Sequence, residues 1–433
     1  MLLIYTPDVS SRFAYTADVL FSQASNNAFT ITTGKDEFLS FTGAKINYSN
    51  QPLRNDELWV QPHGLLFEHD IKPQVIDVFE WNNLKAFFKT GGDAGFDVFA
   101  AAFYLVSRYE EYLPHAKDEY GRYAHTNSIA FKERFLHVPL VNLWLKELAK
   151  MMEGKFPSFT FHFLSFNFTP TYDIDIAYAY KGKGFKRNAG ALARAIKEGR
   201  PGDIAEWLDA ASGFGEDPFD TYRWLDNYHN HYKLKPIYFF LLAQQPGLYD
   251  KNISPEKPIM RRLIKKHAEK YETGIHPSWQ SGDDETLLAQ EIGMLQSITG
   301  SKVMRSRQHY IRMQLPGIYR VLLKYGIIED YTMGYGSING FRASVATPFY
   351  WYDLEKEEKT GLLLRPYCYM EANSYFEQHY TAEQATDELQ QYHDIVKAVS
   401  GQLITIFHNH FITQQQQWQP WKYMYAAFLQ QNL

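Results

Sequence analysis

The 433-residue sequence has little cysteine and little net charge. Its single cysteine, Cys368, excludes an intrachain disulfide and leaves no set of thiolates for a metal site. The formal net charge of -5 argues against non-specific electrostatic binding to the phosphate backbone of nucleic acids. We therefore expect no nucleic-acid partner, and the low cysteine content fits a reducing compartment.

Long hydrophobic runs are also missing. No stretch reaches the roughly 20 apolar residues that a transmembrane helix needs. Residues 1–7 have no basic segment and only a short apolar run, so the sequence predicts no signal peptide. We expect a cytoplasmic protein without a membrane span; the oligomeric state is left open.

Aromatic residues, by contrast, are plentiful, with 31 Tyr, 31 Phe and 9 Trp. Such side chains can line a sugar-binding groove, but they also fill cores, and we attribute most of them to the core. The length suggests two or three domains.

The first 157 residues predict a smaller, mixed α/β domain. Short runs typical of strands alternate there with two helical segments. Gly154, Lys155 and Pro157 then interrupt the pattern and place a domain boundary. The expected strands are 2–5, 28–33, 46–48, 58–61 and 65–68, and the expected helices are 96–113 and 138–152.

From residue 158 to residue 433 the pattern changes to strands followed by helices. Alternation of this kind predicts a mainly parallel sheet or a barrel. A helix-rich insertion at about 180–232 interrupts it. The expected strands end at Asp173 and span 236–241, 273–276, 302–305, 327–329, 362–365 and 403–407.

Polar side chains cluster where several of these strands end, which is where β/α barrels carry their reactive residues. Asp173 and Asp175 are two residues apart, so in an extended chain they face the same side. One carboxylate could bind a divalent cation while the other accepts a proton. Alternatively, both cap backbone amides in a turn.

Three histidines follow other strands. His276 is the last residue of the strand 273–276, and His309 lies in a segment that also contains Arg307. His408 directly follows the strand 403–407. The imidazoles could ligate a metal or move a proton, and the guanidinium could hold a carboxylate ionised. Structural histidines and a solvated loop are the simpler alternatives.

In their order, these clusters resemble the motifs of the polysaccharide deacetylase superfamily, also known as carbohydrate esterase family four. Residues 171–175 are similar to its Thr-Phe-Asp-Asp-like motif, and 276–278 partly match its His-Ser/Thr-x-x-His motif. Arg307 is similar to the Arg of a third motif, and 406–408 to a Leu-x-His motif. The whole chain resembles a bacterial group with an added N-terminal domain, through 96–112 and 334–353.

The resemblance implies a fold and a reaction. The fold is a distorted (β/α) barrel of the deacetylase type over 158–433, preceded by the domain 1–157. The reaction is metal-dependent hydrolysis of an acetyl group on an N- or O-acetylated sugar or glycan precursor. The implied cofactor is a divalent metal, with zinc expected, and the implied partner is a carbohydrate substrate.

The resemblance also implies roles for individual residues. Asp173 would be the general base, Arg307 would orient it, and His408 would be the general acid. Asp175 and His276 would be metal ligands. The candidates for substrate contact are Tyr172, Trp279, Tyr310, Asp330 and Arg342.

Two departures bear on the metal. The second histidine of the family motif would fall at Gln280, and glutamine is a poor zinc ligand. His309 is the candidate replacement, and without it the chain could be a catalytically inactive glycan-binding protein. The two aspartates are also separated by one residue. A third hypothesis is hydrolysis of a different acyl or amide substrate on the same scaffold.

The N-terminal region contributes fewer candidates. Its polar residues could line an interdomain groove, but we expect surface or interface ion pairs of little energetic worth. These residues are Arg108, Glu110, Glu111, Asp118, Arg122 and His125.

Overall fold

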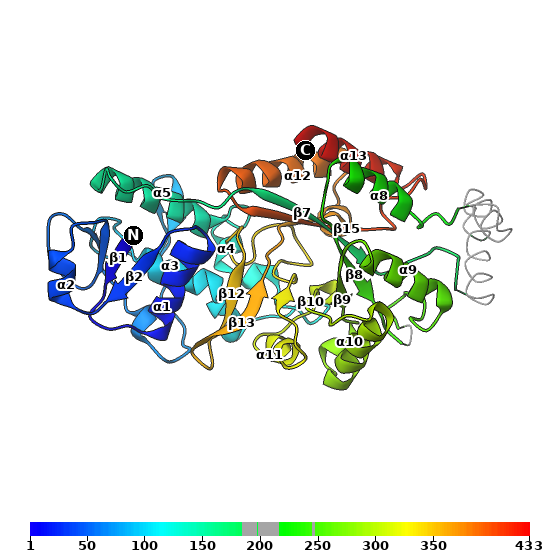
Figure 1. Ribbon diagram of the computed structural model, residues 1–433, viewed down its shortest axis with the longest axis horizontal. Coiled ribbons are helices and arrows are strands. Elements are labelled where there is room, and N and C mark those ends of the chain that lie inside the picture. The colour runs from blue at the N-terminus through cyan, green and yellow to red at the C-terminus, as the bar shows by residue number, and fades with distance from the viewer. Residues whose placement is uncertain (184–196, 198–215, 245–246) are drawn as a thin grey trace.

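The computed structural model describes residues 1–183, 197, 216–244 and 247–433 and contains two sheets and a short hairpin (Figure 1). The smaller sheet is parallel and has the order β2-β1-β3-β4. The hairpin is antiparallel. The strands are β1 Leu2–Tyr5, β2 Phe29–Thr32, β3 Lys45–Tyr48, β4 Leu58–Val60, β5 Phe79–Trp81 and β6 Leu84–Ala86.

Helices of the N-terminal region pack on the smaller sheet and form part of the largest core cluster. The helix α3, Val98–Val106, is apolar on all sides and fully buried, and the side chain of Asp97 caps its first turn. The helices are α1 Ser11–Asp18, η1 Val19–Gln23, α2 Lys35–Ser40, α3 Val98–Val106, η4 His125–Asn127, α4 Ile129–Lys132 and α5 Leu140–Lys155.

Two expected elements of this region are wrong. Residues 65–68 form a 3-10 helix, η2 Leu65–Phe67, and not a strand. Its two leucines are consecutive and both buried, a pattern that a helical turn and a strand covered on both faces share, so the sequence alone does not separate the two. The helix expected over 96–113 ends at Val106, because Arg108 is left-handed with φ 56° and a separate turn, η3 Tyr109–Tyr112, follows.

In the part of the chain that the structure describes, the larger sheet has nine strands in the order β12-β13-β11-β10-β9-β8-β7-β15-β14. All neighbours are parallel except β12 and β13. Among the described residues, the edge strands β12 and β14 do not pair with each other, so the sheet is open and a closed barrel is not seen. The strands are β7 Asn167–Ile174, β8 Ile237–Leu241, β9 Glu272–His276, β10 Arg305–Ser306, β11 Glu329–Asp330, β12 Phe349–Asp353, β13 Glu358–Leu364, β14 Tyr369–Met370 and β15 Gln402–His408.

Helices cover this sheet, with α12 and α13 packed together above β7 and β15 (Figure 1). The strand β8 is a continuous buried apolar run, as expected for a parallel strand covered on both faces. The expected insertion at 180–232 falls partly on 184–196 and 198–215, outside the described residues. The helices are α8 Tyr222–His231, α9 Pro258–Ala268, η5 Gln280–Gly282, α10 Glu285–Thr299, η6 His309–Ile311, α11 Gly317–Lys324, η7 Asn373–Glu377, α12 Ala382–Ala398 and α13 Gln419–Asn432.

Buried polar contacts join the N-terminal region to the rest of the chain. The Arg12 guanidinium donates to the carboxylate of Glu357, which lies in the turn between β12 and β13. Arg342 donates to Glu111 through two nitrogens, at 2.8 and 2.6 Å. Glu111 thus takes part in an ion pair, as expected, but this pair is almost completely buried and so is not of the weak surface kind. The boundary at residue 157 stays a prediction.

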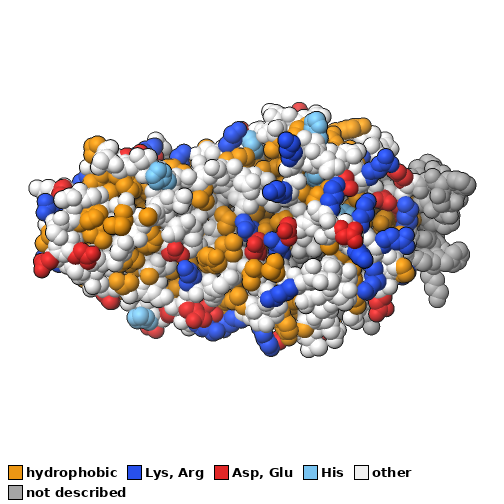
Figure 2. Space-filling model, in the orientation of Figure 1, with side chains coloured by type: hydrophobic (Ala, Val, Ile, Leu, Met, Phe, Trp, Pro, Cys, Tyr) orange, Lys and Arg blue, Asp and Glu red, His pale blue; other side chains and the backbone are white. Residues whose placement is uncertain are grey.

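Two further features concern the surface and the thiol. The face in Figure 2 carries both acidic and basic side chains, while hydrophobic side chains gather over the N-terminal region.

Within the described ranges, no helix combines the length and apolar character needed to cross a bilayer. The Cys368 side chain is buried.

Candidate metal centre

A cavity of about 480 Å³ opens at the carboxyl ends of the larger sheet. The strands β7, β9 and β15 deliver Asp173, Asp175, His276 and His408 to it, and the segment after β10 delivers His309. Because parallel neighbours end at the same edge of a sheet, these side chains converge although they lie far apart in the sequence. The structure thus brings five predicted site residues together.

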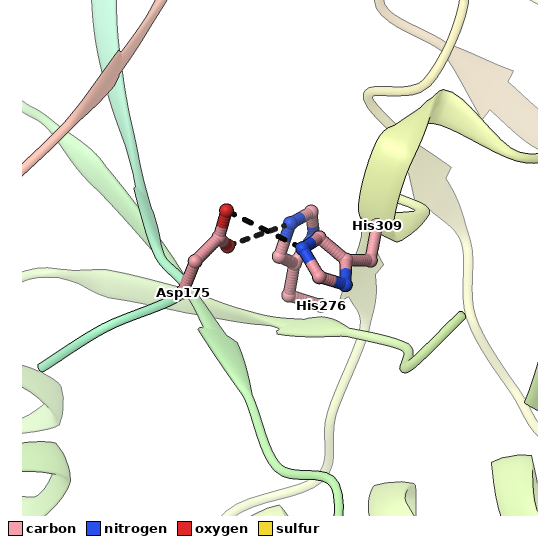
Figure 3. A group of neighbouring side chains, drawn as sticks. All are labelled: Asp175, His276 and His309. Carbon is pink, nitrogen blue, oxygen red and sulfur yellow. Dashed lines mark ion pairs between the residues drawn. The ribbon is translucent and has the colours of Figure 1, made fainter. Parts of the chain in front are cut away.

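Three of them could hold a metal ion: Asp175, His276 and His309 (Figure 3). His276 Nε2 lies 3.2 Å from Asp175 Oδ1, and His309 Nε2 lies 3.4 Å from Asp175 Oδ2. Ligands about 2.0–2.1 Å from a tetrahedral zinc ion lie about 3.4 Å from one another. The three side chains therefore have the spacing of a metal triad.

The outer nitrogens of both imidazoles are already bonded. His276 Nδ1 lies 2.5 Å from the carbonyl oxygen of Arg307, which can accept a hydrogen bond but not donate one. His309 Nδ1 lies 2.8 Å from Oδ1 of Asp250. Protons on both Nδ1 atoms leave the Nε2 lone pairs directed at the carboxylate of Asp175, which is how metal-binding histidines are oriented.

The charge distribution also fits a cation. Among the described residues, no group donates a hydrogen bond to the buried Oδ1 atom of Asp175. Burial alone would raise the pKa of Asp175, but the charges of His309 and His408 outweigh it and hold that pKa well below its usual range. The carboxylate is therefore ionised. Together with the two imidazoles, which offer Nε2 lone pairs once they give up a proton, it makes a donor set that suits zinc and similar divalent ions.

Asp173 lies beside this triad and is held by Arg307. The guanidinium donates 2.8 Å hydrogen bonds to Asp173 Oδ1 and to the hydroxyl of Thr171. It is completely buried and stacks 4.4 Å above the ring of Phe239. Asp173 Oδ2 lies 3.6 Å from His276 Nε2, so this carboxylate reaches the edge of the triad.

His408 lies on the other side of Asp175 and is held by Glu371. The carboxylate of Glu371 lies 2.8 Å from His408 Nδ1, and His408 Nε2 lies 3.4 Å from Asp175 Oδ2. Burial would lower the pKa of His408, but the charges of Glu371 and Asp175 outweigh it and raise that pKa well above its usual value. His408 is thus a candidate proton donor at the cavity.

The predicted substrate-contact residues separate into two groups. Tyr310 lines the cavity, and Trp279 packs 4.8 Å from the ring of Tyr249, which also lines it. The other three do not fit the predicted role, because they are buried in contacts away from the cavity. Tyr172 bonds His229 and Tyr425 on the opposite face of β7, Asp330 bonds Ser306 and Thr332, and Arg342 bonds Glu111.

Several residues of the site were missed from the sequence. Asp250 lies nine residues beyond β8, so no strand end marks it. Glu371 directly follows β14, but a two-residue strand is too short to predict. The N-terminal region also lines the cavity through Glu119, Tyr120 and Arg122, of which Arg122 was named from the sequence as a possible groove residue and the other two were not.

Comparisons with known proteins give remote similarities. A model of a family of unknown function, DUF7033, matches residues 2–157. No functionally curated protein matches the sequence.

Solved structures are similar to this chain at low identity. One is a Mycobacterium smegmatis protein assigned to the polysaccharide deacetylases, with 13% identity, 61% of this chain and 84% of that chain covered, and a TM-score of 0.39. PuuE allantoinase has 11% identity, 61% and 83% coverage and a TM-score of 0.38. The Bacillus cereus polysaccharide deacetylase Bc1974 has 12% identity, 62% and 86% coverage and a TM-score of 0.28. Similarity at this level is remote.

Proposed function

We propose that this chain is a metal-dependent hydrolase that removes acetyl groups from an N- or O-acetylated sugar or glycan precursor. The observation that carries the proposal is the triad of Asp175, His276 and His309. The carboxylate of Asp173, bonded by Arg307, lies on one side of it, and the imidazole of His408, bonded by Glu371, lies on the other. A divalent cation held by the triad would act as a Lewis acid toward the acyl carbonyl.

The residues around the triad have complementary tasks. Asp173 accepts a proton from the water that attacks the acyl carbon, and Arg307 keeps this carboxylate ionised and oriented. His408 donates a proton to the departing nitrogen or oxygen as its bond to the acyl carbon breaks. Glu371 holds the imidazole with Nε2 toward the cavity. The products are acetate and the free amine or alcohol.

The walls of the cavity suit a sugar. Its volume of about 480 Å³ falls in the range typical of small-molecule sites. Both aromatic and polar side chains line it, and aromatic rings offer apolar faces to sugars. The aromatic lining residues are Tyr120, Tyr249, Tyr310, Phe376 and Phe411.

The alternative of an inactive glycan-binding protein rested on Gln280. This side chain is exposed, and His309 lies beside Asp175 in the place of a third ligand. The position of His309 favours the hydrolase, and glycan binding without acetate release would support the inactive alternative. Hydrolysis of another amide or ester remains as an outcome of the test.

The test is acetate release from a panel of N-acetyl and O-acetyl sugars by protein loaded with Zn²⁺ or Co²⁺, alongside amides that contain no sugar. We expect hydrolysis of acetylated sugars, and a loss of about 10²- to 10⁴-fold in kcat for Asp173→Asn with metal binding retained. Turnover of only the non-sugar amides would show a different acyl substrate. Failure of the wild-type protein to bind any divalent metal would overturn the proposal.

A further inference from the structure

A hairpin of the N-terminal region reaches into the wall of the metal cavity. Lys117 and Tyr123 pair in an antiparallel bridge, and Asp118 closes the turn between them. Oδ1 of Asp118 accepts hydrogen bonds from the backbone N–H groups of Tyr120, at 3.0 Å, and Arg122, at 2.9 Å. The side chains of Tyr120 and Arg122 line the cavity. The hairpin is therefore a locally fixed element and part of the site.

Arg122 connects this hairpin to the segment that carries a metal ligand. Its Nε donates a 2.6 Å hydrogen bond to Asp118 Oδ2, which fixes the direction of the guanidinium. Its Nη1 donates a 2.9 Å hydrogen bond to the backbone carbonyl oxygen of Tyr310. The residue is 5% exposed, so both bonds are shielded from water. Arg122 thus fixes the carbonyl directly after His309.

The backbone at this carbonyl is unusual. Tyr310 and Ile311 have φ values of 57° and 56°, in the left-handed region that L-residues disfavour. Two consecutive residues of this kind, one of them β-branched, persist only where the surroundings hold them. They come immediately after His309, so the turn they form sets the direction from which its imidazole enters the site.

A glycine makes room for the contact. A Cβ atom at Gly336 would lie 2.1 Å from Nη1 of Arg122 and 2.9 Å from the carbonyl oxygen of Tyr310. Both distances are too short for any side chain to be accommodated without movement. Nearby, the Ser337 hydroxyl lies 2.9 Å from Nδ1 of His125, so the N-terminal region docks on this loop at a second point.

We propose that Arg122 is a positioning residue for the metal centre: it holds the left-handed turn at Tyr310 and thereby the orientation of His309. The inference rests on the proposed function, because it takes His309 as a metal ligand. The N-terminal region thereby contributes to the metal site, because its Arg122 guanidinium fixes the turn that follows His309.

The test compares metal binding by full-length variants. Zn²⁺ affinity is measured by competition with a chelator, and the visible absorption spectrum of the Co²⁺-loaded protein reports the ligand geometry. We expect Arg122→Ala to lower the Zn²⁺ affinity by about 10-fold or more, which is the usual effect of removing a residue that orients a metal ligand. We also expect it to alter the Co²⁺ spectrum. His309→Ala provides the reference for loss of the ligand itself.

Gly336→Ala tests the same contact from the other side while Arg122 is kept. We expect it to lower the metal affinity by displacing the guanidinium. In the double variant Arg122→Ala/Gly336→Ala, the second change should add less than it does alone, because the 2.1 Å clash with the guanidinium is gone and the 2.9 Å approach to the Tyr310 carbonyl oxygen remains. Additive losses would overturn the proposal.

Arg12→Ala is the matched control. Arg12 is also a buried arginine that joins the N-terminal region to the larger sheet, through Glu357, but it does not line the cavity. We expect it to lower the thermal midpoint while leaving metal affinity and the Co²⁺ spectrum unchanged.

The outcomes separate the two proposals. Unchanged metal affinity and an unchanged Co²⁺ spectrum in Arg122→Ala, with His309→Ala impaired, would overturn the positioning role alone. Equal losses in Arg12→Ala and Arg122→Ala would show a general docking effect and overturn it as well. A wild-type protein that binds no metal would overturn both the proposed function and this inference.

Discussion

Asp250 and His309 form a buried pair in which the carboxylate Oδ1 lies 2.8 Å from Nδ1 of the imidazole. The same oxygen accepts a 2.9 Å hydrogen bond from the backbone N–H of Trp279. The carboxylate therefore fixes both the tautomer and the rotation of the ring, and it directs Nε2 toward Asp175.

Removing this carboxylate should weaken the metal site. We expect Asp250→Ala to lower Zn²⁺ affinity by about 10- to 100-fold, because the His309 ring loses the partner that orients it. Asp250→Asn keeps an oxygen that can accept from Nδ1 and should lose less. Chelator competition measures both, and equal affinities in wild type and Asp250→Ala would contradict the orienting role.

Changing Gln280 should not affect the metal. The side chain is exposed and is absent from the described lining of the cavity, so a histidine there does not reach Asp175. We expect Gln280→His to leave Zn²⁺ affinity unchanged, whereas His309→Ala lowers it sharply. A Gln280→His substitution that restored binding to His309→Ala would show that the third ligand was placed wrongly.

Glu371 should matter most for poor leaving groups. We expect Glu371→Gln to lower kcat for acetylated amines by about 10-fold or more, because the imidazole of His408 loses its negative partner. Aryl acetate esters, whose leaving groups depart without a proton, should be nearly unaffected. Metal affinity provides the control and should not change. An equal loss on both substrate types would point to distortion of the site instead of a defect in proton donation.

The buried pair of Glu111 and Arg342 should make folding sensitive to acid. Burial alone would raise the pKa of Glu111, but the charges of Arg342 and Arg108 outweigh it and lower that pKa from 4.5 to about 2. A lowered pKa stabilises the folded state above pH 4.5, and this contribution is lost as the pH falls from 4.5 toward 2. It amounts to about 3 kcal/mol.

Urea unfolding at pH 7 and at pH 3 measures this contribution. We expect Glu111→Gln to lower the free energy of unfolding at pH 7 by about 3–5 kcal/mol, since two buried guanidinium groups lose their carboxylate. The variant should also lose less stability than wild type between pH 7 and pH 3. The same loss in both proteins would assign the acid sensitivity to other groups.

The sequence predicted the parts of the site that follow strands. Asp173, Asp175, His276 and His408 lie at the ends of β7, β9 and β15, where hydrophobic runs stop and polar residues begin. Parallel pairing then brings such ends to one edge, so residues more than 200 positions apart meet without any further information.

The missed residues have no such signal. Glu371 meets His408 across 37 residues, through loops whose path depends on tertiary packing. Arg122 was named from the sequence, but its contact with Tyr310, 188 residues away, could not be predicted for the same reason. The prediction for Arg342 was wrong for the same reason, because its partner Glu111 lies 231 residues away in the N-terminal region.

The sequence also could not predict that the larger sheet is open. Strand–helix alternation is equally compatible with a closed barrel and with an open parallel sheet. The difference lies in the edges, where β12 and β13 turn antiparallel and β14 is only two residues long. Neither feature alters the hydrophobic pattern from which strands are predicted.

The burial of Cys368 has a practical consequence. Burial raises the pKa of this thiol, so it stays protonated and reacts slowly with alkylating reagents. A thiol introduced by Glu119→Cys, at the tip of the N-terminal hairpin, would then be the fast-reacting one and could take a single fluorophore or spin label in the otherwise native chain. The distance from that label to a paramagnetic ion in the triad can be followed in solution while ligands are added.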